Sequence, residues 1–233
     1  MKLILTFFRN ILKNRVMSEI ISEPKLESIV FEECPYVILL DPGHGIDTEG
    51  KESPLWNDGS QLKEWIFNRA IAKKIIDILN EKSISFKLIV PEDEDVPLRE
   101  RADRANSFQE EIKKPCLYIS IHGNAADSPK ARGFEVFTSP RQTVSDVCAT
   151  IMFRIMEAEK LFKMRACYQD GDPDKEAKFV ILQKTKMAAI LTENGFFTNE
   201  AECKKMLTGS FQNKIAEVHV KAIEKIIKNR ILG

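Results

Sequence analysis

The sequence predicts an α/β fold, a single domain whose twisted, mostly parallel central sheet of about six strands carries helices on both faces. Two observations predict this class. Short apolar runs rich in branched side chains end at turn residues, which is typical of strands buried on both faces. Longer segments with apolar side chains at helical spacing separate these runs, and strands that alternate with helices form a parallel sheet. The 233 residues, of which 43% are hydrophobic, suffice for one domain with a substantial core.

The expected strands are six short apolar runs, at residues 37–40, 86–90, 117–121, 134–138, 179–182 and 188–191. Asp41, Pro42 and Gly43 stop the first run and Pro91 stops the second, because such residues favour turns. The fourth run alternates apolar and polar residues. The others are nearly continuous and therefore fit the interior of a parallel sheet.

The expected helices lie at residues 62–81, 98–112, 142–162, 199–207 and 211–227. The apolar stripe of the first one consists of Leu62, Ile66, Ala70 or Ile71, Ile75 and Leu79. These residues recur at steps of three or four, which is the spacing of one helix face. The polar, glycine-containing stretch from Gly45 to Gly59 is too long for a simple connection, so it is a candidate functional loop.

The chain divides at about residue 35. Residues 1–34 are an N-terminal appendage that could be partly helical, and residues 35–233 are the domain that carries the function. The opening MKLILTFF is too short for a signal peptide and is soon interrupted by Arg9, Lys13 and Arg15. No segment approaches the roughly 18 apolar residues of a membrane span. We therefore expect synthesis in the cytoplasm without a clear export signal, and no integral membrane segment.

Charge and cysteine usage narrow the function further. Lys and Arg together number 35, as do Asp and Glu, so nothing in the overall charge favours nucleic acid as a partner. The five cysteines are scattered and include no C-x-x-C pair. Unpaired thiols in a reducing compartment are therefore expected, in place of a disulfide framework or a zinc finger.

Side chains that can bind a metal follow three of the expected strands: His44, His122 and Glu193. Ligands of open α/β sheets bind beyond the carboxyl ends of the strands, so these side chains converge if the strands are neighbours. Two imidazoles and a carboxylate, with one position left for water, make a catalytic zinc site. A second acid would serve as general base. Glu64 offers the second carboxylate, since it starts the next helix and shares a face with Asn68.

Each of these residues also has an ordinary structural interpretation. Dispersed ligands form no local signature, so two histidines at strand ends could be a coincidence. Glu64 could simply interact with the dipole at the start of its helix. Glu193 could be a turn residue before Gly195.

Three motifs, however, resemble those of one enzyme family. DPGHG (41–45), SIHGNA (120–125) and TENGFFTN (192–199) occur in the order and spacing of the zinc-dependent N-acetylmuramoyl-L-alanine amidases, the Amidase_3 family. Stretches at 64–72, 98–106, 132–136, 179–182 and 187–191 are similar as well. The resemblance covers roughly residues 36–227 and implies a zinc hydrolase.

Carried over residue by residue, the resemblance implies that His44, Glu64 and His122 bind one Zn2+ per chain and that Glu193 is the catalytic carboxylate. The implied substrate is peptidoglycan or a muropeptide, cut at the amide between N-acetylmuramic acid and the L-alanine of the stem peptide. Glu193 would take a proton from zinc-activated water and pass it to the leaving nitrogen.

The chain also departs from the family pattern. Gly123 stands where alanine is usual and Ala188 where proline is common. Both are small changes away from the reacting atoms, so we expect activity to survive them. The loop between Gly45 and Leu62 is longer and more polar than expected, which puts the substrate preference in doubt.

Several further residues carry weaker expectations. Asn68 and Asn124 could orient the ligands, although Asn124 could equally satisfy a turn. Asp41 could orient the His44 loop in the same way, but capping of that loop is the favoured role. The remaining candidates are expected to be structural: a solvated Arg132, a structural or exposed His219, and core positions for Trp65, Phe67 and Phe196.

Three rival interpretations remain at this point. They are a different zinc peptidase on a similar scaffold, a cell-wall-binding protein that has lost turnover, and a purely structural protein. The presence of all four expected residues argues against a degenerate binder. We expect a monomer that acts at the bacterial cell wall, either as a lysin released at lysis or as an exported remodelling or recycling enzyme.

Overall fold

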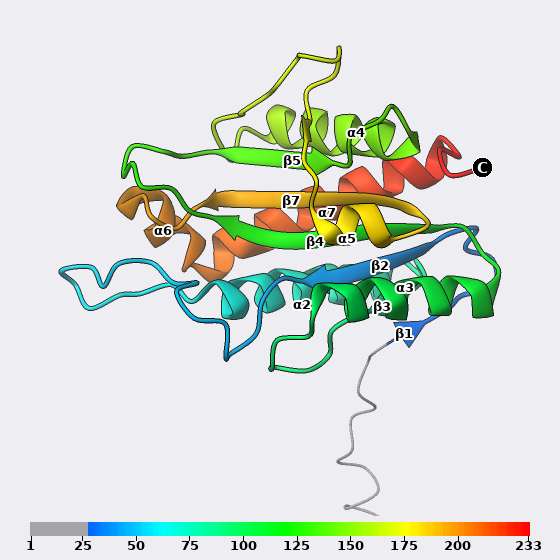
Figure 1. Cartoon of the computed structure of the whole chain (residues 1–233), viewed down its shortest axis with the longest axis horizontal. Helices are drawn as coiled ribbons and strands as arrows, with labels where there is room; N and C mark the ends of the chain where they lie inside the picture. The colour runs from blue at the N-terminus through cyan, green and yellow to red at the C-terminus, as the bar shows by residue number, and fades with distance from the viewer. Residues whose placement is uncertain (1–27) are drawn as a thin grey trace, which may run out of the picture.

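A seven-stranded sheet runs through the computed structural model, which describes residues 28–233 (Figure 1). The opening segment 1–27, including the apolar stretch discussed above, lies outside the described residues. The strand order is β1-β3-β2-β4-β7-β5-β6. The strands are β1 (Ser28–Ile29), β2 (Val37–Pro42), β3 (Phe86–Leu88), β4 (Cys116–Asn124), β5 (Phe134–Thr138), β6 (Lys175–Glu176) and β7 (Ala188–Phe196).

The centre of the sheet is parallel. Strands β3, β2, β4 and β7 pair in parallel, whereas β1 is antiparallel to β3 and β5 is antiparallel to β7. The helices are α2 (Glu64–Glu81), α3 (Leu98–Ile112), α4 (Val144–Glu159), α5 (Val180–Lys184), α6 (Glu200–Met206) and α7 (Gly209–Lys228). The predicted α/β class with a mostly parallel sheet is confirmed.

Helices cover both faces of the sheet, as predicted (Figure 1). Side chains of α2, α4 and α7 pack on one face in the larger core cluster, and those of α3 and α5 pack on the other. Strand β2 is continuously apolar from Val37 to Leu40 because it is buried on both faces of the sheet. Val37 and Leu39 join the second cluster, while Ile38 and Leu40 join the first, and none of the four is exposed. Burial of each such side chain contributes about 1.5–3 kcal/mol to folding.

Two expectations about individual elements were wrong. Residues 179–182 are not a strand, because helix α5 starts at Val180 and buries only Ile181 and Leu182. An apolar run of four residues suits a short helix as well as a strand, and periodicity cannot separate the two. Ile66, which was placed in the apolar stripe of α2, is 50% exposed.

The buried face of α2 explains the position of Ile66. This face contains Glu64, Phe67, Asn68 and Ile71. Ile66 is two residues from Glu64, about 200° around the helix, and therefore faces solvent. The inner face at this end of the helix is shared by polar and apolar residues, so an apolar stripe drawn from the sequence alone is misplaced at Ile66.

The described chain begins against the sheet. Ser28 and Ile29 pair with β3, and Cys34 is buried. The ammonium group of Lys114 donates hydrogen bonds to the carbonyl oxygens of Phe31 and Cys34, at 3.1 and 3.3 Å. All five cysteines are free thiols. No helix within residues 28–233 is both long and apolar enough to span a membrane.

Candidate active site and metal centre

The carboxyl ends of three adjacent strands bring the predicted site residues to one edge of the sheet. Strand β4 lies between β2 and β7. His122 on β4 is directly opposite Glu193 on β7, and His44 follows the end of β2 by two residues. The order of the strands therefore makes neighbours of three motifs that are far apart in the sequence.

Glu64 lies between the two histidines. Its Oε1 is 3.0 Å from Nδ1 of His122, and its Oε2 is 3.3 Å from Nε2 of His44. One ligand atom from each of the three residues lies within 4.8 Å of the other two. The imidazole centroids are 5.0 Å apart and the rings are nearly perpendicular. Glu64 is 2% exposed, whereas both histidines keep a partly exposed edge.

The charge of Glu64 follows from these contacts. Burial on its own would raise the pKa of the carboxyl group, but the hydrogen bonds with His122 and His44 outweigh burial and lower the pKa to about 2. Burial likewise opposes the charge on His122, and the contact with Glu64 raises the pKa of His122 above its usual value. A buried anion is thus held between two imidazoles.

These residues fit a zinc ion. Two imidazole nitrogens and one carboxylate oxygen, with an open side towards solvent, are the ligand types and number of a catalytic zinc centre. A buried carboxylate needs a compensating charge, which a cation at this point supplies. Gly43 makes the arrangement possible, because a Cβ atom there would be 2.0 Å from the His122 ring. The suitability of these residues for zinc thus rests on their ligand atoms and on the close packing of Gly43 against the His122 ring.

The start of α2 and the end of β4 fix the Glu64 carboxylate. The amide of Asn68 donates to the carbonyl oxygen of Gly43 at 3.0 Å and to Glu64 Oε1 at 3.4 Å. The backbone N–H of Gly123 also donates to Glu64 Oε1, at 3.3 Å. A methyl group at Gly123 would be 3.2–3.5 Å from three side chains, so the glycine allows close packing at this point.

The backbone of His44 is held in an uncommon conformation. Its φ angle is 63°, in the left-handed region that non-glycine residues seldom adopt. Two guanidinium groups hold its carbonyl oxygen: Arg69 donates at 2.8 Å and Arg101 at 3.5 Å. Arg101 also donates to the carbonyl oxygen of Pro42 at 3.0 Å. These bonds fix the turn that aims the His44 ring at Glu64.

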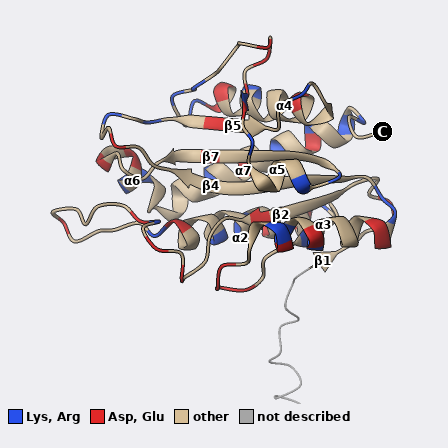
Figure 2. Ribbon diagram, in the orientation of Figure 1, with Lys and Arg blue, Asp and Glu red and all other residues tan. Residues whose placement is uncertain are grey.

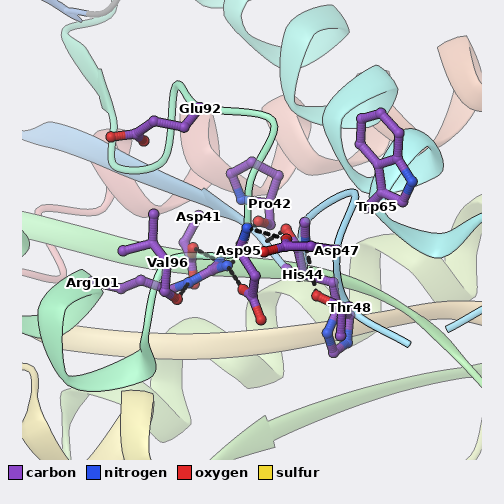
Figure 3. Close-up of polar contacts among 12 residues, drawn as sticks. Asp41, Pro42, His44, Asp47, Thr48, Trp65, Glu92, Asp95, Val96 and Arg101 are labelled. Carbon is purple, nitrogen blue, oxygen red and sulfur yellow. Dashed lines mark hydrogen bonds and ion pairs between the residues drawn. The ribbon is translucent and has the colours of Figure 1, made fainter. Parts of the chain in front are cut away.

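Arg101 is itself anchored by two carboxylates (Figure 3). It reaches from α3 to Asp41 at 2.7 Å and to Asp95 at 2.6 Å, and both Arg101 and Asp41 are fully buried. Ser120 donates to the second oxygen of Asp41 at 3.0 Å. Asp41 therefore supports the His44 loop through Arg101, which is the orienting role and not the capping role that the sequence favoured.

Glu193 carries a carboxylate oxygen without a partner. Its Oε2 is buried and accepts no hydrogen bond from any described residue. Burial raises the pKa of the Glu193 carboxyl to about 8, and the negative charges of Glu64 and Glu135 act in the same direction. A carboxyl group with a pKa near neutrality can both accept and release a proton at physiological pH.

A group of charged residues beyond Glu193 escaped the sequence analysis. Glu135 on β5 lies opposite Glu193 and is buried. It forms ion pairs with Arg165 and with Lys175, the latter at 2.6 Å. Asn124 donates to its other oxygen at 2.9 Å, so the contact of Asn124 is with Glu135 and not with a metal-binding residue. The only sequence feature that pointed to this group was the position of Glu135 within residues 132–136, a stretch that resembles the amidase motifs.

The loop between β2 and α2 borders this site. Its base is closed by a bridge between Glu52 and Lys63 and by a 2.8 Å hydrogen bond from Ser53 N to the carbonyl oxygen of Leu62. Its tip is open, with Leu55 69% exposed. The backbone N–H of Glu64 donates to the carbonyl oxygen of Lys51 at 2.9 Å, which places this part of the loop beside Glu64.

The remaining predicted residues are mostly structural. His219 is fully buried in α7, and Phe67 and Phe196 belong to the buried apolar set. Arg132 is exposed, as expected for a solvated arginine. The core prediction for Trp65 was wrong: its ring is partly exposed and lies under the Arg69 guanidinium, 5.5 Å from the ring centroid. Trp65 directly follows buried Glu64 in α2, and successive residues of a helix lie about 100° apart, so Trp65 lies at the edge of the buried face.

Known proteins resemble this chain in sequence and in fold. An endolysin of Bacillus phage SPP1 is 31% identical over 82% of this chain and 66% of its own length. The N-acetylmuramoyl-L-alanine amidase CwlM of Bacillus licheniformis is 30% identical over 81% of this chain and 67% of its own length. The chain thus spans about two thirds of these relatives.

A solved structure extends the likeness to three dimensions. The N-acetylmuramoyl-L-alanine amidase of Clostridium difficile 630 superposes with a TM-score of 0.70 at 27% identity, covering 83% of this chain and 97% of that one. The sequence profile of the Amidase_3 family matches residues 38–225, a span that contains His44, Glu64, His122 and Glu193. The chain therefore belongs to the Amidase_3 family of N-acetylmuramoyl-L-alanine amidases.

Proposed function

We propose that this chain is a zinc-dependent N-acetylmuramoyl-L-alanine amidase that hydrolyses peptidoglycan at the amide between N-acetylmuramic acid and the L-alanine of the stem peptide. One observation carries the proposal. In a chain of this family, a buried Glu64 carboxylate lies between His44 and His122, next to an unpartnered Glu193 carboxylate.

In this proposal His44, Glu64 and His122 hold one zinc ion per chain. A bound zinc ion lowers the pKa of a coordinated water towards neutrality and polarises a carbonyl group. The chain contributes a preset donor geometry. Asn68 and the Gly123 N–H hold one carboxylate oxygen, and Arg69 and Arg101 hold the His44 backbone.

Glu193 moves the proton. Its Oε2 takes a proton from the attacking water and later delivers it to the amide nitrogen, because an amine leaves poorly unless it is protonated. This Oε2 is buried and has no hydrogen-bond partner among the described residues, which leaves it available to hold the proton between the two steps. Correctly placed proton transfer of this kind is worth about 10²–10⁴ in rate.

The decisive experiment measures zinc content and release of stem peptide from purified peptidoglycan, before and after chelation. We expect about one zinc per chain, loss of cleavage on chelation, and recovery with added zinc. Glu193→Gln should keep zinc and lose cleavage, whereas Asp127→Asn, an exposed carboxylate on the same side of the sheet, should keep both.

The outcomes separate the parts of the proposal. Zinc binding without cleavage at the lactyl–alanine bond would support the metal centre and overturn the substrate, leaving a cell-wall-binding protein or another amide hydrolase. Absence of bound zinc in the active protein would overturn the roles of His44, Glu64 and His122. Full turnover by Glu193→Gln would remove Glu193 from the mechanism.

We also propose a lysin-like role for a monomeric catalytic domain at residues 35–233. Similarity to a phage endolysin supports release at lysis, although similarity to bacterial amidases supports export and remodelling as well. A chain that starts at residue 35 should bind zinc and cleave peptidoglycan, and it should sediment as a single subunit. Lysis of producing cells only after membrane permeabilisation would favour the lysin role.

A further inference from the structure

A second group of carboxylates lies at the other end of β5 from Glu135. Asp146 is in the first turn of α4, and Asp172 and Asp174 are in the long segment that leads into β6. Figure 2 marks acidic residues in red on α4 and on the segment that follows it. One oxygen from each of the three lies within 4.8 Å of the others. Because Phe137 pairs with Leu191, this end of β5 points away from Glu193 along β7.

The negative charge of this cluster is not compensated by side chains. Within residues 28–233, no lysine, arginine or histidine forms an ion pair with Asp146, Asp172 or Asp174. Lys175, which directly follows Asp174 in sequence, pairs with Glu135 instead. The start of α4 supplies about half a positive charge, which is small against three carboxylates. Asp170 and Glu176 add to the excess, since each also lies within reach of Asp146.

A fully buried member of the cluster has an oxygen without a partner. Asp174 is 2% exposed, and its Oδ1 is buried and accepts no hydrogen bond. Oδ1 of Asp172 is buried and unpartnered as well. The hydroxyl of Thr138 is 2.7 Å from Asp174 Oδ2 and 3.2 Å from Asp146 Oδ1, but it carries a single hydrogen. The site therefore has more acceptors than donors, and a buried acceptor without a partner is costly.

Two kinds of partner would satisfy these oxygens: a shared proton or a cation. Burial, followed by the close approach of the Asp172 carboxyl as a hydrogen-bond partner and by the charges of Asp172 and Asp146, raises the pKa of Asp174 to about 8. One proton would neutralise one of the three carboxylates and leave the others uncompensated. A dication bridges all three at once and accepts the remaining lone pairs.

We propose that Asp146, Asp172 and Asp174 bind a hard divalent cation of the calcium class, separate from the zinc centre. All the available donors are oxygens, and carboxylate oxygens select calcium, magnesium or manganese over zinc. Calcium accepts six to eight oxygens in flexible geometry, which suits ligands from an α-helix and a loop; magnesium requires a stricter octahedron.

The cation would fasten the segment between α4 and α5 to the sheet. This segment carries Arg165 and Lys175, both of which bind Glu135 next to Glu193. Its direct links to the end of β5 are few: β6 is two residues long, and Ala177 N donates to the carbonyl oxygen of Thr138 at 2.9 Å. Bound calcium therefore stabilises the fold around the catalytic strand and takes no part in hydrolysis.

The test uses full-length, zinc-loaded protein purified in calcium-free buffer and titrated with calcium chloride alone. Calorimetry should detect one additional site per chain. The midpoint temperature of thermal unfolding should rise by about 5–10 °C when calcium is in hundredfold excess over its dissociation constant. Magnesium should raise the midpoint less, and calcium should not change the zinc content. Asp174→Asn should abolish the calcium shift and, because repulsion is relieved, should unfold at a higher temperature than the wild type without calcium.

Asp172→Asn should also abolish the calcium shift. It keeps the test decisive if Asp174→Asn fails to fold. Asp127→Asn, an exposed carboxylate outside the cluster, should keep the full calcium shift. No response of the wild type at about 10 mM calcium, above the roughly 10⁻⁴–10⁻³ M dissociation constants of weak protein sites, would overturn the proposal in favour of a shared proton. An undiminished calcium shift in both cluster variants would overturn it too.

Discussion

Acidification should destabilise this protein through His219, and the size of the effect follows from its surroundings. The imidazole is fully buried in α7. The carbonyl oxygen of Ile215, 2.9 Å from Nδ1, can only accept, so Nδ1 carries the hydrogen and Nε2 accepts from the hydroxyl of Thr192 at 3.1 Å. This arrangement suits the neutral ring alone. Burial accordingly lowers the pKa of His219 from 6.5 to about 4.

The sign of the pH dependence follows from that shift. The unfolded chain binds a proton at His219 below about pH 6.5, whereas the folded chain resists protonation until about pH 4. The contribution of neutral His219 to the free energy of unfolding is therefore fully present above pH 6.5 and is lost as the pH falls towards 4. For a pKa that differs by about 2.5 units, the loss is about 2 kcal/mol between pH 7 and pH 5 and about 3 kcal/mol in full.

The measurement is the free energy of unfolding in urea at pH 7, 6 and 5, for the wild type and for His219→Gln. Other groups also titrate in this range, but they are common to both proteins, so the difference between the two curves isolates His219. We expect the variant to lose about 2 kcal/mol less than the wild type on going from pH 7 to pH 5. Parallel curves for the two proteins would refute the reasoning.

Three further predictions concern the site itself. Gly43→Ala should reduce zinc content measured by metal analysis, since its Cβ would be 2.0 Å from the His122 ring, whereas Gly50→Ala, with no atom within 4 Å, should keep its zinc. Arg101→Met should lower the free energy of unfolding by about 3–5 kcal/mol in urea titrations, because it leaves Asp41 buried and charged, and a loss below 1 kcal/mol would contradict that account. Glu193→Gln should lower kcat for muropeptide cleavage by about 10²-fold or more with zinc retained.

The sequence predicted those parts of the site that lie in compact motifs. His44, His122 and Glu193 each follow a recognisable buried strand, and Glu64 starts a clear helix. Their predicted roles remain proposals, but the structure brings His44, Glu64 and His122 together and places Glu193 opposite His122. A strand segment and the turn after it are local properties, which is why the position of each side chain at a strand end could be predicted.

The parts that could not be predicted depend on contacts between distant residues. Arg165 is 30 positions from Glu135, and Lys175 is 40 positions away, so no local pattern marks their ion pairs. The pairing of Arg101 with Asp41 spans 60 positions. The error at 179–182 had a different origin, because a short apolar run has no period long enough to distinguish a helix from a strand.

The closed base of the loop between β2 and α2 separates the conformation of the loop's tip from the position of α2. The bridge between Glu52 and Lys63 and the bond between Ser53 and Leu62 fix where the loop leaves and rejoins the domain, whatever lies between them. Within the loop, Trp56 still donates to the thiol of Cys203 at 3.2 Å and Asp58 pairs with Lys204 at 3.0 Å. A longer segment in place of residues 57–61 should nevertheless leave Glu64 in position, because lengthening a surface loop adds little to its closure entropy. The segment beside the site can thus be varied at its exposed tip while the residues on the closed base hold the start of α2 where it is.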